Sequence, residues 1–182
     1  YYSNGTIKQI KLIRKGVIIP SKNEDDLNYY TSRFNQSLNA GDLKEANKYC
    51  SKMFRIDSTS SDAHFTKGIL MFKEDRFEES INEFDKALIM EPLMRESFAY
   101  RGVARLKKHQ FTNVKIPAKD NKVILSDLEV MISLPNDEQE KICSDFQQAE
   151  FLDFSEYYTK KIIPEIVSNY CQLKSARKAS AN

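Results

Sequence analysis

A repeat of about 34 residues is the feature that most limits what this chain can fold into. Gly68 recurs one repeat later as Gly102, and the small residue Ala46 recurs as Ser80. Large apolar residues keep the same spacing at Leu43, Phe77 and Phe111. Repeats of this length with small residues at fixed places form helix pairs that bury their apolar faces against neighbouring pairs. The sequence therefore predicts a helical solenoid with a concave surface that binds other proteins.

The composition agrees with this prediction and disfavours two other classes. Of the 182 residues, 41% are hydrophobic and 30% are charged, which suits a protein with both a core and a polar surface. The net charge of +2 is too small to predict a nucleic-acid-binding face, since Lys and Arg alternate with Asp and Glu. No apolar run reaches the roughly 18 residues of a membrane-spanning helix. We therefore expect neither nucleic acid as a partner nor a membrane-spanning segment.

The start of the chain has a different pattern. Residues between Ile7 and Ile13 and between Val17 and Ile19 are rich in β-branched side chains, and Arg14-Lys15-Gly16 separates the two runs at a glycine turn. This pattern predicts a short β-hairpin. We therefore divide the chain into a hairpin and linker at 1–25 and a helical solenoid at 26–182.

From Leu27 onward the apolar period is helical, and a Pro just past the fourth predicted helix marks its end. The predicted helices are 26–39, 42–56, 61–73, 77–90 and 94–108, with a capping helix at 155–174. The segment Thr112–Asn121 contains Pro117, so we expect an exposed loop there. Two pairings remain open beyond it. Either about ten inserted residues separate the third helix pair, or 122–134 and 138–152 form a fourth repeat.

The middle repeat carries a recognisable pattern of residue types. Its residues are His64, Lys67-Gly68 and Met71 in the first helix and Phe77, Ser80, Phe84 and Ala87 in the second, followed by Pro92. This pattern resembles the tetratricopeptide (TPR) repeat, in which small residues let two helices approach closely. The resemblance implies an all-α, TPR-like helix–turn–helix solenoid of three to four repeats. It also implies a non-enzymatic scaffold for protein–protein interaction.

Both ends of the chain show narrower resemblances. Tyr1-Tyr2-Ser3-Asn4-Gly5 resembles one unit of the repeats in MORN-like bacterial surface and antitoxin-type proteins. The stretch from Cys143 to Ala149, with Tyr170-Cys171, resembles the closing repeat of TPR proteins from Bacteroidota. That likeness implies a disulfide between Cys143 and Cys171 if the chain is exported, with Cα atoms about 5–6 Å apart, and free thiols in the cytosol. It favours a bacterial cell-envelope location.

The TPR resemblance also implies where a partner binds, because the first helix of each repeat lines the groove. Phe65, Ile69 and Phe72 share one face of the predicted helix 61–73. Equivalent positions in the neighbouring repeats complete a predicted partner-binding groove with Asn35, Val103 and Leu106. Either a partner covers this face, or the hairpin or the terminal segment does. The sequence leaves both alternatives open.

One TPR subclass, found in co-chaperones, grips the C-terminal carboxylate of its partner with Lys, Asn and Arg side chains. Of the five equivalent positions in this chain, only Asn35 keeps the required residue. The other four are Thr31, Thr66, Glu96 and Tyr100. Glu96 would repel a carboxylate, so the comparison disfavours this ligand.

The residues that carry catalytic or metal chemistry are sparse. The two histidines lie apart, His64 at a packing position and His109 at a helix end, and no Cys or His has metal-ligand spacing. There is no glycine-rich phosphate loop. We therefore expect no enzymatic activity, no cofactor and no metal. The alternative to a scaffold is a structural spacer in a longer bacterial cell-envelope protein, and we expect this chain, which begins at Tyr1, to be a piece of a longer product.

Overall fold

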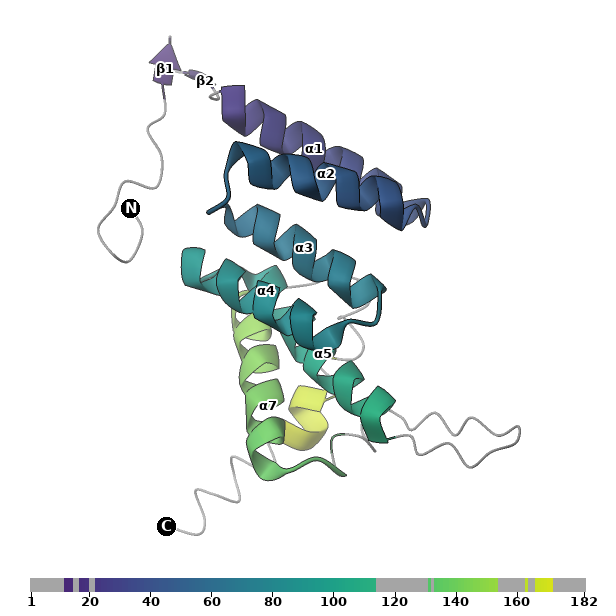
Figure 1. The fold of residues 1–182 in the computed structure, drawn as a ribbon. Coiled ribbons are helices and arrows are strands. Elements are labelled where there is room, and N and C mark those ends of the chain that lie inside the picture. Colours follow the sequence, from purple (N-terminus) through teal and green to yellow (C-terminus); the bar gives the residue numbers. More distant parts are fainter. Residues whose placement is uncertain are drawn as a thin grey trace.

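Helix pairs stacked on one another make up the fold of the computed structural model (Figure 1). The elements are β1 (Leu12–Arg14), β2 (Val17–Ile19), α1 (Lys22–Asn39), α2 (Leu43–Ile56), α3 (Ser61–Lys73), α4 (Phe77–Met90), α5 (Arg95–Asn113), α7 (Asn136–Phe151) and η1 (Val167–Cys171). Helix α1 pairs with α2, α3 with α4, and α5 with α7. The structure describes residues 12–14, 17–19, 22–113, 131, 133–153, 163 and 166–171.

The two short strands lie before the first helix. They pair antiparallel, with Leu12 opposite Ile19 and Arg14 opposite Val17. The MORN-like motif at residues 1–5 lies outside the described residues, so that resemblance stays a prediction. The division of the chain into a hairpin and linker at 1–25 and a solenoid at 26–182 also stays a prediction.

A close contact between a glycine and a phenylalanine sets the spacing within two of the three pairs. A Cβ atom added to Gly68 would lie 2.7 Å from Cδ1 of Phe84, and one added to Gly102 would lie 2.7 Å from Cδ1 of Phe146. These distances are far inside van der Waals contact, so only glycine fits between the ring and the helix backbone. Both rings have no exposed surface.

Small residues on α4 also allow the close approach of α3 and α4 in the second pair. The Ser80 hydroxyl donates a hydrogen bond to the carbonyl oxygen of Gly68 at 2.8 Å. Ser80 and Ala87 are both fully buried. A larger side chain at either position would separate α3 from α4, as the sequence pattern predicted.

The third pair differs from both pairings that the sequence left open. The partner of Gly68 is Phe84 on the next helix, whereas the partner of Gly102 is Phe146 on α7. Residues 114–135 separate α5 from α7, so the insertion is far longer than the sequence predicted. Helix α5 also continues to Asn113, which makes Thr112 helical rather than part of a loop. Residues 114–121 lie outside the described residues.

The turns inside the first two pairs share a backbone conformation that the sequence conceals. Gly41 has φ +75°, and Asp75, one repeat later, has φ +58°. The amide of the following residue closes the same type of bond in each turn, Asp42 to the Ser37 carbonyl and Arg76 to the Met71 carbonyl, both at 2.9 Å. This is the hydrogen bond of a Schellman motif, which usually requires glycine at the left-handed position. Aspartate tolerates that conformation better than most residues.

The C-terminal part of the chain closes the end of the stack. Cys143 on α7 forms a disulfide with Cys171 on η1, and their Cα atoms lie 5.5 Å apart. Buried side chains from α5 and α7 form one apolar cluster around this bond, together with Met131, Leu134, Ile163, Ile166, Val167 and Cys171. Of the predicted capping helix 155–174, residues 163 and 166–171 are described, and Val167–Cys171 is π-helical. The third cysteine, Cys50, is buried, and burial raises the pKa of its thiol to about 11.

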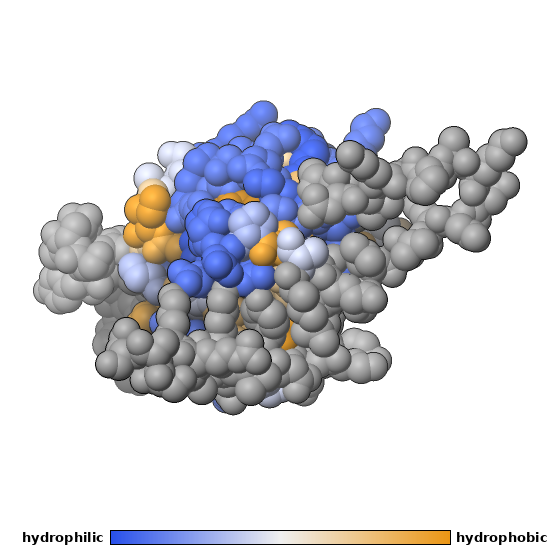
Figure 2. All heavy atoms as spheres, turned by 90° about the horizontal axis from the view of Figure 1, so that it is seen from below, coloured by the Kyte–Doolittle hydropathy of each residue, from blue (hydrophilic) through white to orange (hydrophobic). Residues whose placement is uncertain are grey.

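The outer surface is mainly polar. Figure 2 shows the face seen from below, which is largely hydrophilic with scattered hydrophobic patches where described residues reach it. Among the described residues, the exposed large hydrophobic side chains are Tyr29, Ile89, Leu93 and Phe151. They come from different elements rather than from one continuous face.

Replacing Gly68 with Ala tests the glycine–phenylalanine contact. The added methyl group must displace the buried Phe84 ring, which outweighs the helix propensity that Ala gains. We expect Gly68→Ala to lower the free energy of unfolding by about 1–2 kcal/mol, measured by urea denaturation. The control Asn82→Ala, at an exposed position on α4, should leave stability unchanged or slightly raised. A Gly68→Ala protein as stable as the wild type would contradict this account.

The disulfide gives a second test of stability. The bond joins residues 28 apart, and cross-linking a loop of this length removes conformational entropy from the unfolded chain. The double variant Cys143→Ala/Cys171→Ala should lose about 3–4 kcal/mol of unfolding free energy. Reduction of the wild type with dithiothreitol should cause a similar loss. Equal stability of the oxidised and reduced wild type would show that the bond does not hold the terminal segment in place.

Candidate functional site

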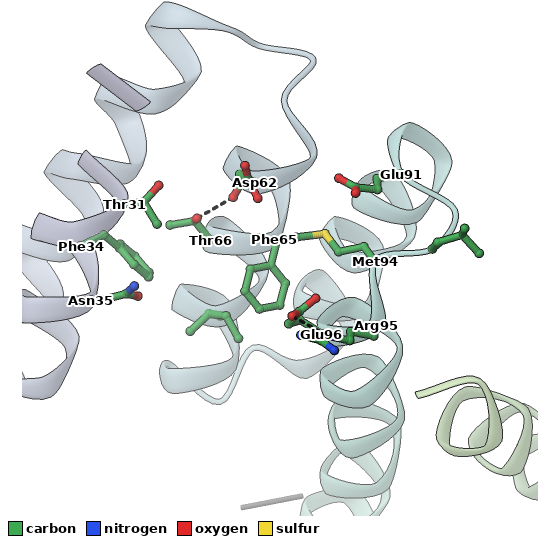
Figure 3. Close-up of a pocket in the computed structure, with 12 residues that line it drawn as sticks. Thr31, Phe34, Asn35, Asp62, Phe65, Thr66, Glu91, Met94, Arg95 and Glu96 are labelled. Atoms are coloured by element: carbon green, nitrogen blue, oxygen red, sulfur yellow. Dashed lines mark hydrogen bonds and ion pairs between the residues drawn. The ribbon is translucent and has the colours of Figure 1, made fainter. Parts of the chain in front are cut away.

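An open hollow lies between the first helices of the three pairs (Figure 3). Its volume is about 430 Å³. Side chains from α1, α3, the α4–α5 connection and the start of α5 line it: Thr31, Phe34, Asn35, Asp62, Phe65, Thr66, Ile69, Glu91, Leu93, Met94, Arg95 and Glu96. Because the helix pairs stack with their first helices on one side, residues far apart in the sequence meet here.

Three of the predicted groove residues line this hollow. Asn35 is exposed on α1, Phe65 is half-buried on α3, and Ile69 is buried one turn further along α3. The Phe65 ring also packs inward, with its centroid 5.7 Å from that of Phe84 and 5.8 Å from that of Tyr100. The Phe65 side chain therefore lines the hollow and also packs against aromatic rings of the core.

The other three predicted groove residues do not line the hollow. Val103 and Leu106 are each 1% exposed, because they pack in one apolar cluster with buried side chains of α7 and with Met131 and Ile163. Phe72 is half-buried, with its ring 5.5 Å from Phe77 and 6.3 Å from Tyr100. The prediction that Val103 and Leu106 face a groove was therefore wrong. At that end of the stack, the terminal segment of the chain covers the predicted groove face, which is the second alternative that the sequence left open.

Four of the five positions carried over from the carboxylate-gripping TPR subclass line the hollow. They are Thr31, Asn35, Thr66 and Glu96. The fifth, Tyr100, is half-buried against the rings of Phe65 and Phe84. Four of the five positions that the resemblance identified therefore meet in one hollow, and only Asn35 among them keeps the residue type of that subclass.

The two threonine hydroxyls already donate their protons within the protein. Thr31 Oγ1 donates to the Leu27 carbonyl at 2.9 Å, and Thr66 Oγ1 donates to the Asp62 carbonyl at 2.5 Å. A hydroxyl has one proton to donate and two lone pairs that accept. In these conformations neither hydroxyl has a proton left to donate to a ligand in the hollow.

Carboxylates outnumber cations in the walls. Asp62, Glu91 and Glu96 line the hollow together with a single cation, Arg95, which gives a formal charge of −2 (three negative against one positive). The Arg95 guanidinium donates to Glu96 at 3.2 Å and to the Asp153 carbonyl, at the end of α7, at 3.2 Å. Ser61 donates to Glu91 at 2.9 Å.

A buried carboxylate joins α3 to α4. Glu83, 5% exposed, accepts hydrogen bonds from Lys67 at 3.0 Å and Lys86 at 2.8 Å, and its other oxygen lies 2.8 Å from His64 Nδ1. Burial alone would raise the pKa of Glu83, but the bonds from Lys86, His64 and Lys67 outweigh burial and lower the pKa to about 2. His64 therefore has the structural role that its position predicted.

The third pair repeats this arrangement. Arg101, one repeat after Lys67, binds the buried carboxylate of Asp145 through Nε at 3.1 Å, and Arg105 binds the same group at 3.1 Å. Arg101 also reaches back to Asp85 on α4 at 2.5 Å. A basic residue directly before the repeat glycine, paired with an acid directly before the repeat phenylalanine, is a signal that the sequence contained and the prediction missed.

Within the part of the chain that the structure describes, no group of three or more His, Cys, Asp or Glu side chains could hold a metal ion. Among the described helices, none is long and apolar enough to cross a membrane. His109 lies 3.3 Å from Glu138 on α7, in a contact between helices.

Comparison with known proteins supports the fold. No family model matches the chain, and no curated protein matches it. Solved structures of TPR domains are similar. The Arabidopsis OM64 TPR domain has a TM-score of 0.55 at 11% identity, with 81% of this chain and 98% of that chain covered. The second TPR domain of human RPAP3, solved with an HSP70 peptide, has a TM-score of 0.52 at 14% identity, with 79% and 97% covered.

A bacterial protein is similar to the same degree. The type III secretion translocator chaperone SycD of Yersinia enterocolitica has a TM-score of 0.56 at 12% identity, with 82% of this chain and 95% of that chain covered. At these identities the likeness concerns the fold alone. The chain therefore has a TPR-like helical-repeat fold.

The Glu83 network predicts a pH dependence of stability. The folded-state pKa of about 2 lies below the ordinary value of 4.5, so the stabilisation is complete above about pH 5 and is lost as pH falls toward 2. Glu83→Gln should lower the unfolding free energy at pH 7 by about 1.5–3 kcal/mol and flatten its decline across this window. Urea denaturation at several pH values measures both effects. Glu79→Gln, an exposed control on the same helix, should change both less, and equal effects of the two variants would contradict the prediction.

Proposed function

We propose that this chain is a non-enzymatic scaffold for protein–protein interaction that binds a segment of a partner protein in the hollow between α1, α3 and α5. The observation that carries the proposal is the hollow itself. It lies on the side formed by the first helices of the pairs, and exposed Asn35, half-buried Phe65 and buried Ile69 line it. An aromatic ring beside polar side chains is typical of surfaces that anchor peptides.

The structural neighbours support peptide binding as the mode. The RPAP3 domain was solved in complex with the HSP70 peptide SGPTIEEVD, so a TPR domain of similar fold binds a peptide. The clamp residues of the carboxylate-binding subclass are absent here apart from Asn35. The partner of this chain is therefore expected to present a different chemical group.

We also propose that the protein works in an oxidising compartment, such as the envelope of a bacterium of the Bacteroidota. The disulfide between Cys143 and Cys171 supports this location, because such bonds persist outside the reducing cytosol. The alternative function, a structural spacer in a longer envelope protein, fits the same location. It makes no use of the hollow, so a binding experiment separates the two.

Filling the hollow with a large side chain tests the scaffold function. Asn35 is exposed, so Asn35→Trp should leave the melting temperature near the wild-type value while it occupies the space that a peptide needs. Peptides are selected on the immobilised wild-type protein from a random linear library displayed on phage. The affinity of a selected peptide, measured by fluorescence polarisation, should fall roughly tenfold or more in the Asn35→Trp protein.

The control is Asn47→Trp, the same change at an exposed position of α2 that does not line the hollow. It should bind the selected peptide as the wild type does. If no peptide is selected, or if both Trp variants bind the selected peptide with wild-type affinity, the scaffold function fails and the spacer becomes the better interpretation.

A further inference from the structure

We propose that the hollow recognises a basic segment, with a Lys or Arg side chain of the partner protein seated in it. This inference rests on the proposed function and names the chemistry of its ligand. It places a cation where the carboxylate-gripping TPR subclass places an anion.

The charges of the lining residues favour a cation. The three carboxylates come from separate elements, Asp62 from α3, Glu91 from the α4–α5 connection and Glu96 from α5, and they surround the opening of one hollow (Figure 3). A concave site lined mainly by one sign of charge attracts the opposite charge. A C-terminal carboxylate would instead meet a formal charge of −2.

The hydrogen bonds within the wall also disfavour a carboxylate ligand. Thr31 and Thr66 donate their hydroxyl protons to the Leu27 and Asp62 carbonyls, so neither has a proton left for a ligand. A carboxylate ligand needs donors, whereas an ammonium or guanidinium group brings several donors and needs acceptors. The two threonines therefore disfavour a carboxylate, as the charged part of the wall does.

Arg95 is the single cation among the lining residues. Its Nη1 donates to the Asp153 carbonyl at 3.2 Å, so part of the guanidinium is directed toward the end of α7. Its contact with Glu96 is a pair between partly exposed groups, and such pairs contribute little. A partner's cation can therefore compete for Glu96 without breaking a strong bond.

The apolar walls suit the rest of such a side chain. Phe65 provides an aromatic ring, and a cation within about 6 Å of a ring face is attracted to it. Leu93 is 72% exposed at the rim. Lys and Arg carry long apolar stems that pack along such surfaces while the charged end remains solvated or paired.

Charge inversion at the wall tests the inference. The peptides selected from the phage library on the wild-type protein should be enriched in Lys and Arg. A selected basic peptide should bind Glu96→Lys roughly tenfold more weakly, and its affinity for the wild type should fall as NaCl is raised. The HSP70 peptide SGPTIEEVD, which is acidic and ends in a carboxylate, should bind the wild type more weakly than the selected peptides.

Two further variants make the result specific. Glu150→Lys makes the same charge change at an exposed position of α7 that does not line the hollow, and it should bind the basic peptide within about twofold of the wild type. Glu96→Gln removes the charge without adding another, and its affinity should be intermediate. Melting temperatures of all variants verify that they are folded.

The outcomes separate this inference from the function on which it rests. If the selected peptides are acidic or neutral and Asn35→Trp still abolishes their binding, the scaffold function stands and the basic ligand is wrong. If basic peptides bind Glu96→Lys and Glu150→Lys equally well, the attraction comes from the general surface and the inference is overturned. If Asn35→Trp binds every selected peptide like the wild type, both proposals fail.

Discussion

The contact between a helix glycine and a buried phenylalanine ring fixes the geometry on which the rest of this structure depends. Gly68 against Phe84 and Gly102 against Phe146 bring paired helices closer than any other residue would allow. The distance between helices determines how one pair stacks on the next. The same contact recurs in the third pair, although residues 114–135 separate its two helices in the sequence. The glycine–phenylalanine contact, rather than adjacency in the sequence, therefore identifies the helix that pairs with α5.

This geometry also produces the proposed binding surface. The stack places α1, α3 and the start of α5 around one hollow, and ion pairs of the buried carboxylates Glu83 and Asp145 join the helices within the second and third pairs. In our proposal, Thr31, Thr66 and Glu96 stand where the carboxylate-gripping TPR subclass has its clamp residues, and the hollow prefers a cation to an anion.

Local features of the fold could be predicted from the sequence, whereas contacts across the long insertion could not. The bounds of α3 and α4 follow from periodicity and turn residues, because those signals are local. Val103 and Leu106 were misplaced since the residues that bury them lie beyond the insertion, from Met131 onward. Asp75 concealed a left-handed turn that Gly41 makes visible one repeat earlier, because aspartate is a less obvious signal than glycine.

The central claim is that the hollow between α1, α3 and α5 is the surface that binds a partner. Titration of the ¹⁵N-labelled protein with a selected peptide, followed by heteronuclear NMR, tests it most directly. The account predicts that the largest amide shift changes cluster at residues that line the hollow, such as Asn35, Thr66 and Glu96, with little change at exposed positions of α2 and α4 such as Asn47 and Asn82. Shift changes concentrated on α2 and α4, with the hollow unaffected, would contradict it.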